Sequence, residues 1–259
     1  VTPEPLVSQV YLPSRKGTLQ VEMLAAARRH GRVAYTLEPA FGDLLREVAA
    51  GNPVLVLQDI GVVTTQWHYA VVYGYDYPSG TIRLRSGTEP ERAMPFTAFE
   101  RSWLKGGYWA MVATPPGRLP ATATEAGWAR AAVAMERSGN GAAAAVAYAT
   151  AVRQWPGNIT AAIGLANRHH GQGRLADAEA VLRGALERSP ESTIVLNNLA
   201  QVVSDQGRQE EALALVEKAS DPMGPFAGEV RETRKTILER RDAAAARGSR
   251  AASALPPRK

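Results

Sequence analysis

Cysteine is absent from the 259 residues of the chain. Disulfide bonds and thiolate metal sites are therefore excluded within this sequence, and so is a cysteine nucleophile. Long apolar runs are also missing, because no stretch approaches the ~18 residues that a membrane-spanning helix needs. The hydrophobic fraction of 45% still allows a sizeable core, and the length is sufficient for two domains.

The formal net charge of +5 comes from residues 228–259, where basic residues outnumber acidic ones. Over the rest of the chain the two signs nearly cancel. We therefore expect a solvated, basic helix end rather than a nucleic-acid groove, and no nucleic-acid partner.

The first half of the chain alternates between helical and β-prone stretches. Helices are predicted near 19–30 and over 41–51 and 96–103, from apolar spacing and terminal glycines. Strands are predicted over 33–37, 53–57, the run that His68 opens, 81–85 and 108–113. These elements form an α+β domain at 1–113, and the Pro-rich stretch 114–123 is expected to be a linker.

The second half repeats with a period of 34 residues. Small residues recur in phase at three sets of positions: Gly139, Gly173 and Gly207; Ala144, Ala178 and Ala212; Ala151, Ala185 and Ala219. This pattern is typical of tetratricopeptide repeats (TPR), in which small residues let two helices cross closely. We expect repeats at 124–156, 158–190 and 192–222, a capping helix that completes the array at 246, and a disordered tail at 247–259. The array is expected to bind a protein partner in its groove.

His68 is the candidate for chemistry in the first half. It opens a β-prone run, and the strand that follows the next turn ends at Ser86. From the residues alone, a single histidine at a strand start is most often a core or rim residue, and His30, His169 and His170 are interpreted in the same way. No histidines and carboxylates have metal-ligand spacing, so we expect neither a metal nor a cofactor.

The first 113 residues resemble the bacteriocin-processing, double-glycine peptidase family, which is papain-like. Three features carry the resemblance: the run Gly51-Asn52-Pro53-Val54-Leu55-Val56, His68 with the strand after it, and Phe99 and Trp103 in an aromatic helix. The resemblance implies that His68 is the base of a thiol-dependent peptidase that acts on a peptide or protein. The expected fold class is thus an α+β papain-like peptidase domain, without its N-terminal helix, followed by an all-α TPR solenoid.

Two features depart from that family. Its nucleophilic cysteine and an oxyanion glutamine precede every residue present here, so we expect a missing upstream segment of about 30–50 residues. The family also places an aspartate where this chain has Ser86, which makes Ser86 the expected, uncharged orienter of His68. Asp76 and Asp59 are alternative orienters.

Three hypotheses stay open at this point. In the first, the parent protein is a cysteine peptidase whose TPR array recruits a substrate or partner. Its nucleophile is an upstream thiolate, and His68 is the base that accepts the proton of the thiol. Alternatively, the peptidase-like domain is inactive and serves with the array as a scaffold, or only the TPR half has a function. The composition suggests a bacterial protein and leaves its compartment unknown. Export or envelope anchoring would require a signal ahead of Val1.

Overall fold

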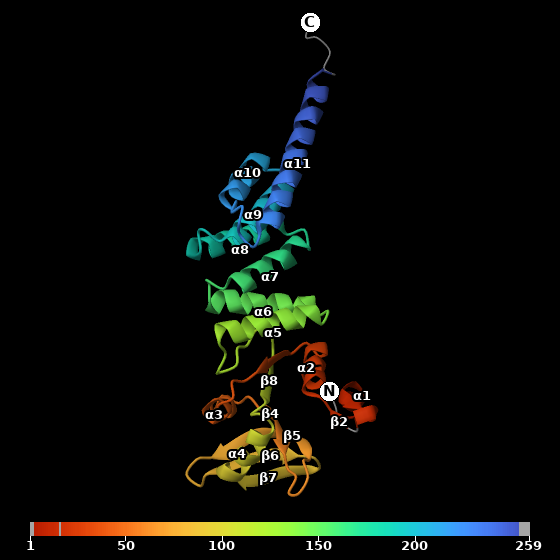
Figure 1. The fold of residues 1–259 in the computed structure, drawn as a ribbon, viewed down its shortest axis with the longest axis vertical. Coiled ribbons are helices and arrows are strands. Elements are labelled where there is room, and N and C mark those ends of the chain that lie inside the picture. The colour runs from red at the N-terminus through yellow and green to blue at the C-terminus, as the bar shows by residue number, and fades with distance from the viewer. Residues whose placement is uncertain (1–2, 16, 254–259) are drawn as a thin grey trace. The chain divides into compact units, whose positions relative to one another are not determined.

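The computed structural model describes residues 3–15 and 17–253, which are drawn in colour in Figure 1. The chain divides into two compact units, Val1–Thr150 and Ala151–Lys259. The first contains antiparallel sheets with helices, and the described part of the second is helical. The prediction of an α+β region followed by a helical region is confirmed. The domain limits expected from the sequence stay a prediction.

A six-stranded antiparallel sheet is the frame of the first unit, in the order β3-β8-β4-β5-β6-β7. The strands are β3 (Val33–Thr36), β4 (Val54–Asp59), β5 (Trp67–Asp76), β6 (Thr81–Ser86), β7 (Glu89–Pro95) and β8 (Ala110–Thr114). All except β7 were predicted from the sequence. β7 contains Pro90 and Pro95 and lies at the sheet edge, where proline is tolerated. A separate two-stranded sheet joins β1 (Tyr11–Leu12) to β2 (Gly17–Thr18).

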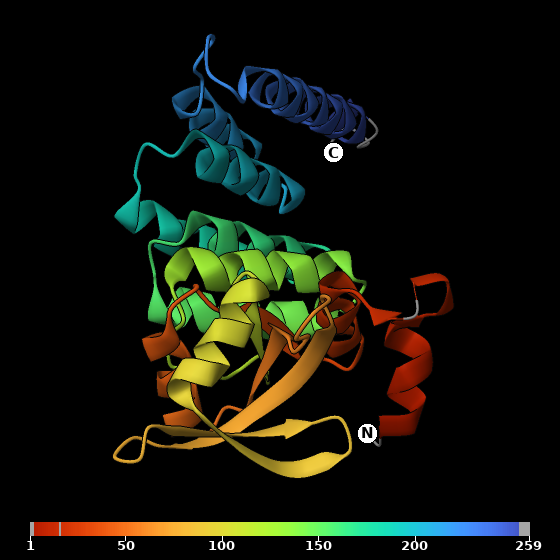
Figure 2. The same ribbon diagram turned by 60° about the horizontal axis from the view of Figure 1, so that its bottom comes forward.

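Two helices, α3 (Phe41–Ala49) and α4 (Phe96–Lys105), pack on one face of this sheet. Figure 2 shows α4 lying across the strands at the end of the sheet that carries β7. Phe41 contacts both Phe96 and Phe99, and Phe99 stacks beside the buried Trp103. This aromatic cluster fixes α4 against the sheet.

The opposite face of the sheet meets α1 (Pro3–Val10) and α2 (Gln20–Arg29). Between these helices and the strands lies a mainly apolar hollow of about 470 Å³, whose sheet side includes Leu55, Val71 and Met111. The strands are therefore less completely covered on this face than on the face of α3 and α4.

Buried polar contacts hold the chain just after β8. Glu47 in α3 is fully buried. Its carboxylate accepts hydrogen bonds from the backbone N–H and the hydroxyl of Thr122, at 2.7 and 2.6 Å, and from the side-chain amide of Asn52 at 2.6 Å. The hydroxyl of Tyr35 accepts a further bond from the backbone N–H of Thr124 at 3.1 Å. The end of the expected linker is thus held to the first unit.

The helix α5 (Glu125–Arg137) begins directly after Thr124, whose side chain accepts a hydrogen bond from the N–H of Gly127 as an N-cap. The indole of Trp128 donates to the carbonyl of Ala147, which joins α5 to α6 (Gly141–Gln154). The division between the two compact units falls inside α6.

The described part of the second unit contains five further helices: α7 (Ile159–His170), α8 (Leu175–Arg188), α9 (Thr193–Asp205), α10 (Gln209–Lys218) and α11 (Ala227–Ser253). The helix α11 continues through residues 247–253, where a disordered tail was expected, and residues 254–259 lie outside the described residues. Among the described residues, no helix combines the length and the apolar character needed to cross a membrane.

The residues that repeat every 34 positions have matching environments. The alanines at 144, 178 and 212 are fully buried, and those at 151, 185 and 219 are at most 3% exposed. The glycines at 139, 173 and 207 each have a positive φ between 73° and 85°, a conformation that favours glycine in the turn before a second helix. The structure therefore gives the repeat pattern the physical basis that the sequence predicted.

Candidate functional site

His68 and Ser86 lie close together at one end of the sheet. The register pairs Ala70 of β5 with Ser86 of β6. His68 is two residues before Ala70, so its side chain is on the same face as Ser86. The hydroxyl oxygen of Ser86 lies 2.8 Å from Nε2 of His68. The hairpin thus places the two residues singled out in the sequence within hydrogen-bonding distance.

The ring of His68 is only partly buried, and its other nitrogen is available. Among the described residues, Nδ1 has no hydrogen-bond partner, whereas Nε2 faces Ser86. Burial lowers the pKa of His68, the positive charge of Arg92 lowers it further, and the charge of Glu89 partly opposes this. The imidazole is therefore neutral at neutral pH and able to accept a proton at Nδ1.

Asp59 does not orient His68. One of its carboxylate oxygens accepts hydrogen bonds from the backbone N–H groups of Gly61 and Gln66, at 2.9 and 2.8 Å. The other lies 3.6 Å from Nζ of Lys105. The backbone hydrogen bonds, led by that of Gln66, lower the pKa of Asp59. Asp59 closes the base of the loop that leads into β5.

The loop closed by Asp59, which leads into the strand of His68, exposes apolar side chains. Val62 and Val63 are 98% and 95% exposed, and Trp67 is more than half exposed. Gly61 is required at the base, because a Cβ atom there would lie 1.7 Å from the carbonyl oxygen of Thr64.

Asp76 is at the far end of β5 from His68. At ~3.3 Å per residue the two are roughly 26 Å apart along the strand, so Asp76 cannot orient the ring. Of the expected orienters, only Ser86 contacts His68.

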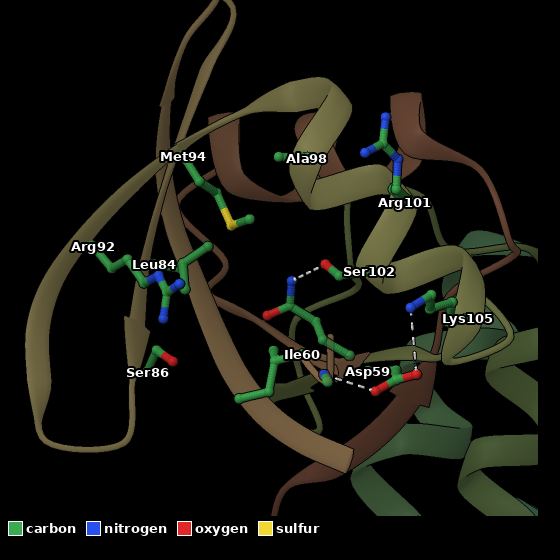
Figure 3. Close-up of a pocket in the computed structure, with 12 residues that line it drawn as sticks. Asp59, Ile60, Leu84, Ser86, Arg92, Met94, Ala98, Arg101, Ser102 and Lys105 are labelled. Carbon is green, nitrogen blue, oxygen red and sulfur yellow. Dashed lines mark hydrogen bonds and ion pairs between the residues drawn. The ribbon is translucent and has the colours of Figure 1, made fainter. Parts of the chain in front are cut away.

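A pocket of about 230 Å³ opens beside Ser86, between the sheet and α4 (Figure 3). Its lining includes three basic residues, Arg92, Arg101 and Lys105, and one acidic residue, Asp59. The side chain of Gln58 is 2% exposed and donates to the hydroxyl of Ser102 at 2.7 Å.

Sequence reasoning missed Arg92 and Gln58 as neighbours of His68. Arg92 lies on β7, which was not predicted, and the register sets it opposite Leu84. Gln58 is paired with His68 across β4 and β5. A prediction of the strand order would have found Gln58, but no local sequence signal pointed to Arg92.

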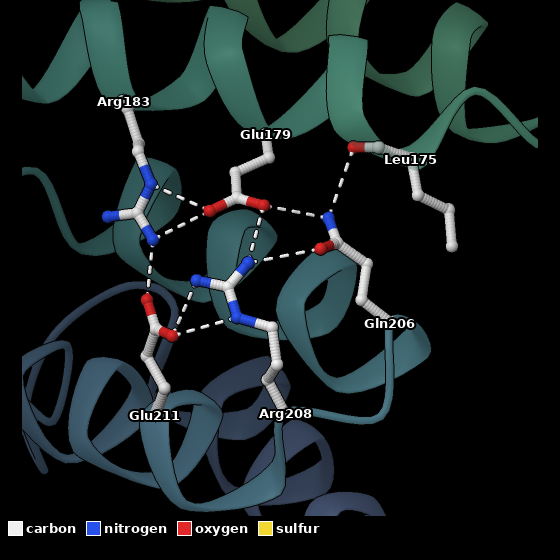
Figure 4. A network of polar contacts seen from close by, with 6 residues as sticks. All are labelled: Leu175, Glu179, Arg183, Gln206, Arg208 and Glu211. Atoms are coloured by element: carbon white, nitrogen blue, oxygen red, sulfur yellow. Dashed lines mark hydrogen bonds and ion pairs between the residues drawn. The ribbon is translucent and has the colours of Figure 1, made fainter.

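In the second unit a charged network joins α8 to the start of α10 (Figure 4). Glu179 accepts hydrogen bonds from Arg183 at 2.7 Å, Arg208 at 2.7 Å and Gln206 at 2.8 Å. Both arginines also bind Glu211 at 2.5 Å. Burial acts to raise the pKa of Glu179, but these hydrogen bonds outweigh it and lower the pKa. The network therefore links one helical hairpin to the next.

Residues 169–223 match the family model described as tetratricopeptide repeat. The match runs from the end of α7 through α10 and includes both arginines of the charged network. A tetratricopeptide repeat suggests protein–protein interaction, because repeats of this kind stack into extended binding surfaces. No curated protein matches the chain.

The other three histidines make contacts that need no catalytic role. In the tetratricopeptide region, His169 lies beside Arg174, and Nε2 of His170 is 2.5 Å from a carboxylate oxygen of Asp205. His30 forms the C-cap of α2. Among the residues that the structure describes, no group of three or more His, Asp or Glu could hold a metal ion.

Proposed function

We propose that the chain is part of a thiol-dependent peptidase in which His68 is the base, Ser86 is its orienter, and the tetratricopeptide repeats recruit a protein partner or substrate. The observation that carries the proposal is the 2.8 Å contact between Ser86 Oγ and His68 Nε2, with Nδ1 left available. A base that is held through one ring nitrogen can take a proton through the other.

The mechanism needs a cysteine from outside these 259 residues, because the chain has none. The thiol would give its proton to Nδ1 of His68, and the thiolate would attack the carbonyl carbon of the substrate. The protonated ring would then donate to the leaving amine, and a water activated by His68 would release the acyl group. Ser86 would keep the ring in one orientation during both steps.

A second function, an inactive peptidase-like domain used as a scaffold, is favoured by the chemistry of Ser86. A hydroxyl carries no charge to stabilise the protonated imidazole, unlike the aspartate of the family. The lowered pKa of His68 also favours the inactive domain, because the surroundings of the ring disfavour its protonated form.

The complete product of the gene provides the test. We expect it to hydrolyse a quenched fluorescent peptide that contains a Gly-Gly sequence, and we expect His68→Ala to reduce the rate by at least about 10²-fold, as for loss of a general base. The control is His30→Ala, which removes a histidine from the C-cap of α2. Hydrolysis that persists in His68→Ala contradicts the proposed base. A complete product that labels with iodoacetamide yet hydrolyses nothing supports the scaffold.

A further inference from the structure

The pocket of Figure 3 has an excess of positive charge. Lys105 and Asp59 face each other at 3.6 Å and largely neutralise one another. The nearest carboxylate to Arg92 is that of the exposed Glu89, 4.0 Å away, and among the described residues Arg101 has no ion pair. Figure 3 shows the side chain of Arg101 pointing away from Arg92, so the guanidinium of Arg92 is the cation left to attract an anion beside Ser86.

The register places Arg92 where it can act on a ligand. Arg92 is opposite Leu84, which shares a face of β6 with Ser86. Figure 3 shows the guanidinium of Arg92 between Leu84 and Ser86. The same Ser86 that contacts His68 therefore also lines the pocket.

The rest of the lining suits a short acidic side chain. Ile60, Leu84, Met94 and Ala98 provide apolar walls, which can contact methylene groups. Ser102 and the buried Gln58 provide polar groups deeper in the pocket. Apolar walls with a guanidinium at one side match an aspartate or glutamate, because a carboxylate pairs well with arginine.

We propose that this pocket binds the carboxylate of an acidic side chain in an extended peptide, with Arg92 as the cation that pairs with it. The acidic residue would then sit beside His68 and determine which peptides are positioned there. This proposal rests on the proposed function for the identity of the peptide as a substrate, whereas the binding itself does not require catalysis.

The experiment uses three N-acetylated tetrapeptides and the full chain, observed by ¹H–¹⁵N NMR. The first is acetyl-Gly-Glu-Gly-Gly-amide, the second has Gln in place of Glu, and the third has Gln with a free C-terminal carboxylate. We expect the Glu peptide to shift the amide signals of Gly61, Ser86 and Ser102, and the other two to shift them much less.

Two variants locate the binding. Arg92→Gln should weaken binding of the Glu peptide about tenfold, the loss of one charge-assisted hydrogen bond. Arg85→Gln makes the same change of charge on the exposed, opposite face of β6 and should leave the affinity unchanged. Arg92→Lys, which keeps the charge, should bind better than Arg92→Gln, and this separates loss of charge from loss of fold.

The proposal is overturned if the Glu and Gln peptides bind equally, if the free C-terminus binds best, or if the shifted signals lie in α7–α11. It is also overturned if no signal moves at millimolar peptide. The His68→Ala variant of the chain should still bind the Glu peptide, whereas the same substitution in the complete gene product should abolish hydrolysis. If the Glu peptide binds in the pocket but the complete gene product hydrolyses no peptide, the proposed peptidase function is wrong and the proposed binding of an acidic side chain is still supported.

Discussion

Arg92 on the edge strand β7 and His68 on β5 are coupled through charge, although β6 lies between the two strands. Burial is the main cause of the lowered pKa of His68, and the guanidinium of Arg92 is the next. The protonation of the candidate base therefore depends on a residue that no local pattern identified.

This coupling predicts the titration of His68 in an Arg92→Gln variant. Removing the positive charge makes the imidazolium less unfavourable, so the pKa of His68 should rise. It should stay below the ordinary value of 6.5, because burial still disfavours the charged ring. NMR titration of the imidazole protons measures both values, and Arg85→Gln should leave the pKa as it is. A fall in the pKa in Arg92→Gln would contradict the assignment.

A Ser86→Asp variant should also raise the pKa of His68, but for a different reason. A carboxylate in place of the hydroxyl would stabilise the protonated ring at Nε2 and raise the pKa of His68. In the complete gene product it should also increase hydrolysis, because the charge supports the imidazolium that forms during the reaction. Ser86→Ala should reduce hydrolysis through kcat. Equal rates in the three proteins would show that residue 86 does not orient the base.

Glu47 should be important for the stability of the first unit. In Glu47→Ala the N–H and hydroxyl of Thr122 and the amide of Asn52 lose their buried acceptor. We expect a loss of about 2–4 kcal/mol in the free energy of unfolding, from several unsatisfied polar groups. Urea denaturation followed by tryptophan fluorescence measures it. The control is Glu100→Ala at an exposed position of α4, which should change stability by no more than about 0.5 kcal/mol.

The surroundings of Asp205 predict that the stability of the second unit depends on pH. It contacts His170 of α7 and Arg240 of α11. Burial would raise its pKa, but the hydrogen bonds from these two residues outweigh it, and the pKa lies below the usual 3.8. A lowered carboxyl pKa gives stability that is fully present above the unfolded value and is lost as the pH falls through the folded value.

Asp205→Asn should therefore be less stable than the unchanged protein at pH 7, by about 1 kcal/mol, since both partners are exposed enough for solvent screening. The difference should shrink at pH 3. Urea unfolding followed by helical circular dichroism gives both free energies. Asp177→Asn, at an exposed position with a longer ion pair of 3.8 Å, is the matched control. A difference that persists unchanged at pH 3 would exclude this linkage.

The parts of the structure that the sequence predicted are those with a local or periodic cause. The 34-residue period predicted small residues where the two helices of each repeat cross closely, and the alanines at those positions are buried. The short hairpin after Asp76 brought Ser86 near His68, since hairpin length determines which residues face each other. Asn158 stands directly before α7, a position where asparagine commonly caps a helix, and its side chain accepts a hydrogen bond from the N–H of Ala161.

The features that escaped prediction depend on contacts between distant segments. Arg92 is near His68 only because the edge strand β7 pairs with β6, and the sequence did not predict that strand. Glu47 has an ionisable side chain yet is fully buried, and Thr122, 75 positions later, supplies two of its hydrogen-bond donors. Such pairings leave no trace in composition or periodicity.

The buried carboxylate of Glu47 also has a practical consequence for dividing the chain. A truncation at the end of β8 would remove Thr122 and leave the Glu47 carboxylate without two of its hydrogen-bond donors. It would also remove the N–H of Thr124 that donates to the hydroxyl of Tyr35. A shortened protein for expression should therefore retain the helical hairpin α5–α6 with the sheet. A failure of the 1–113 fragment to fold would then reflect the position of the cut rather than the quality of the domain.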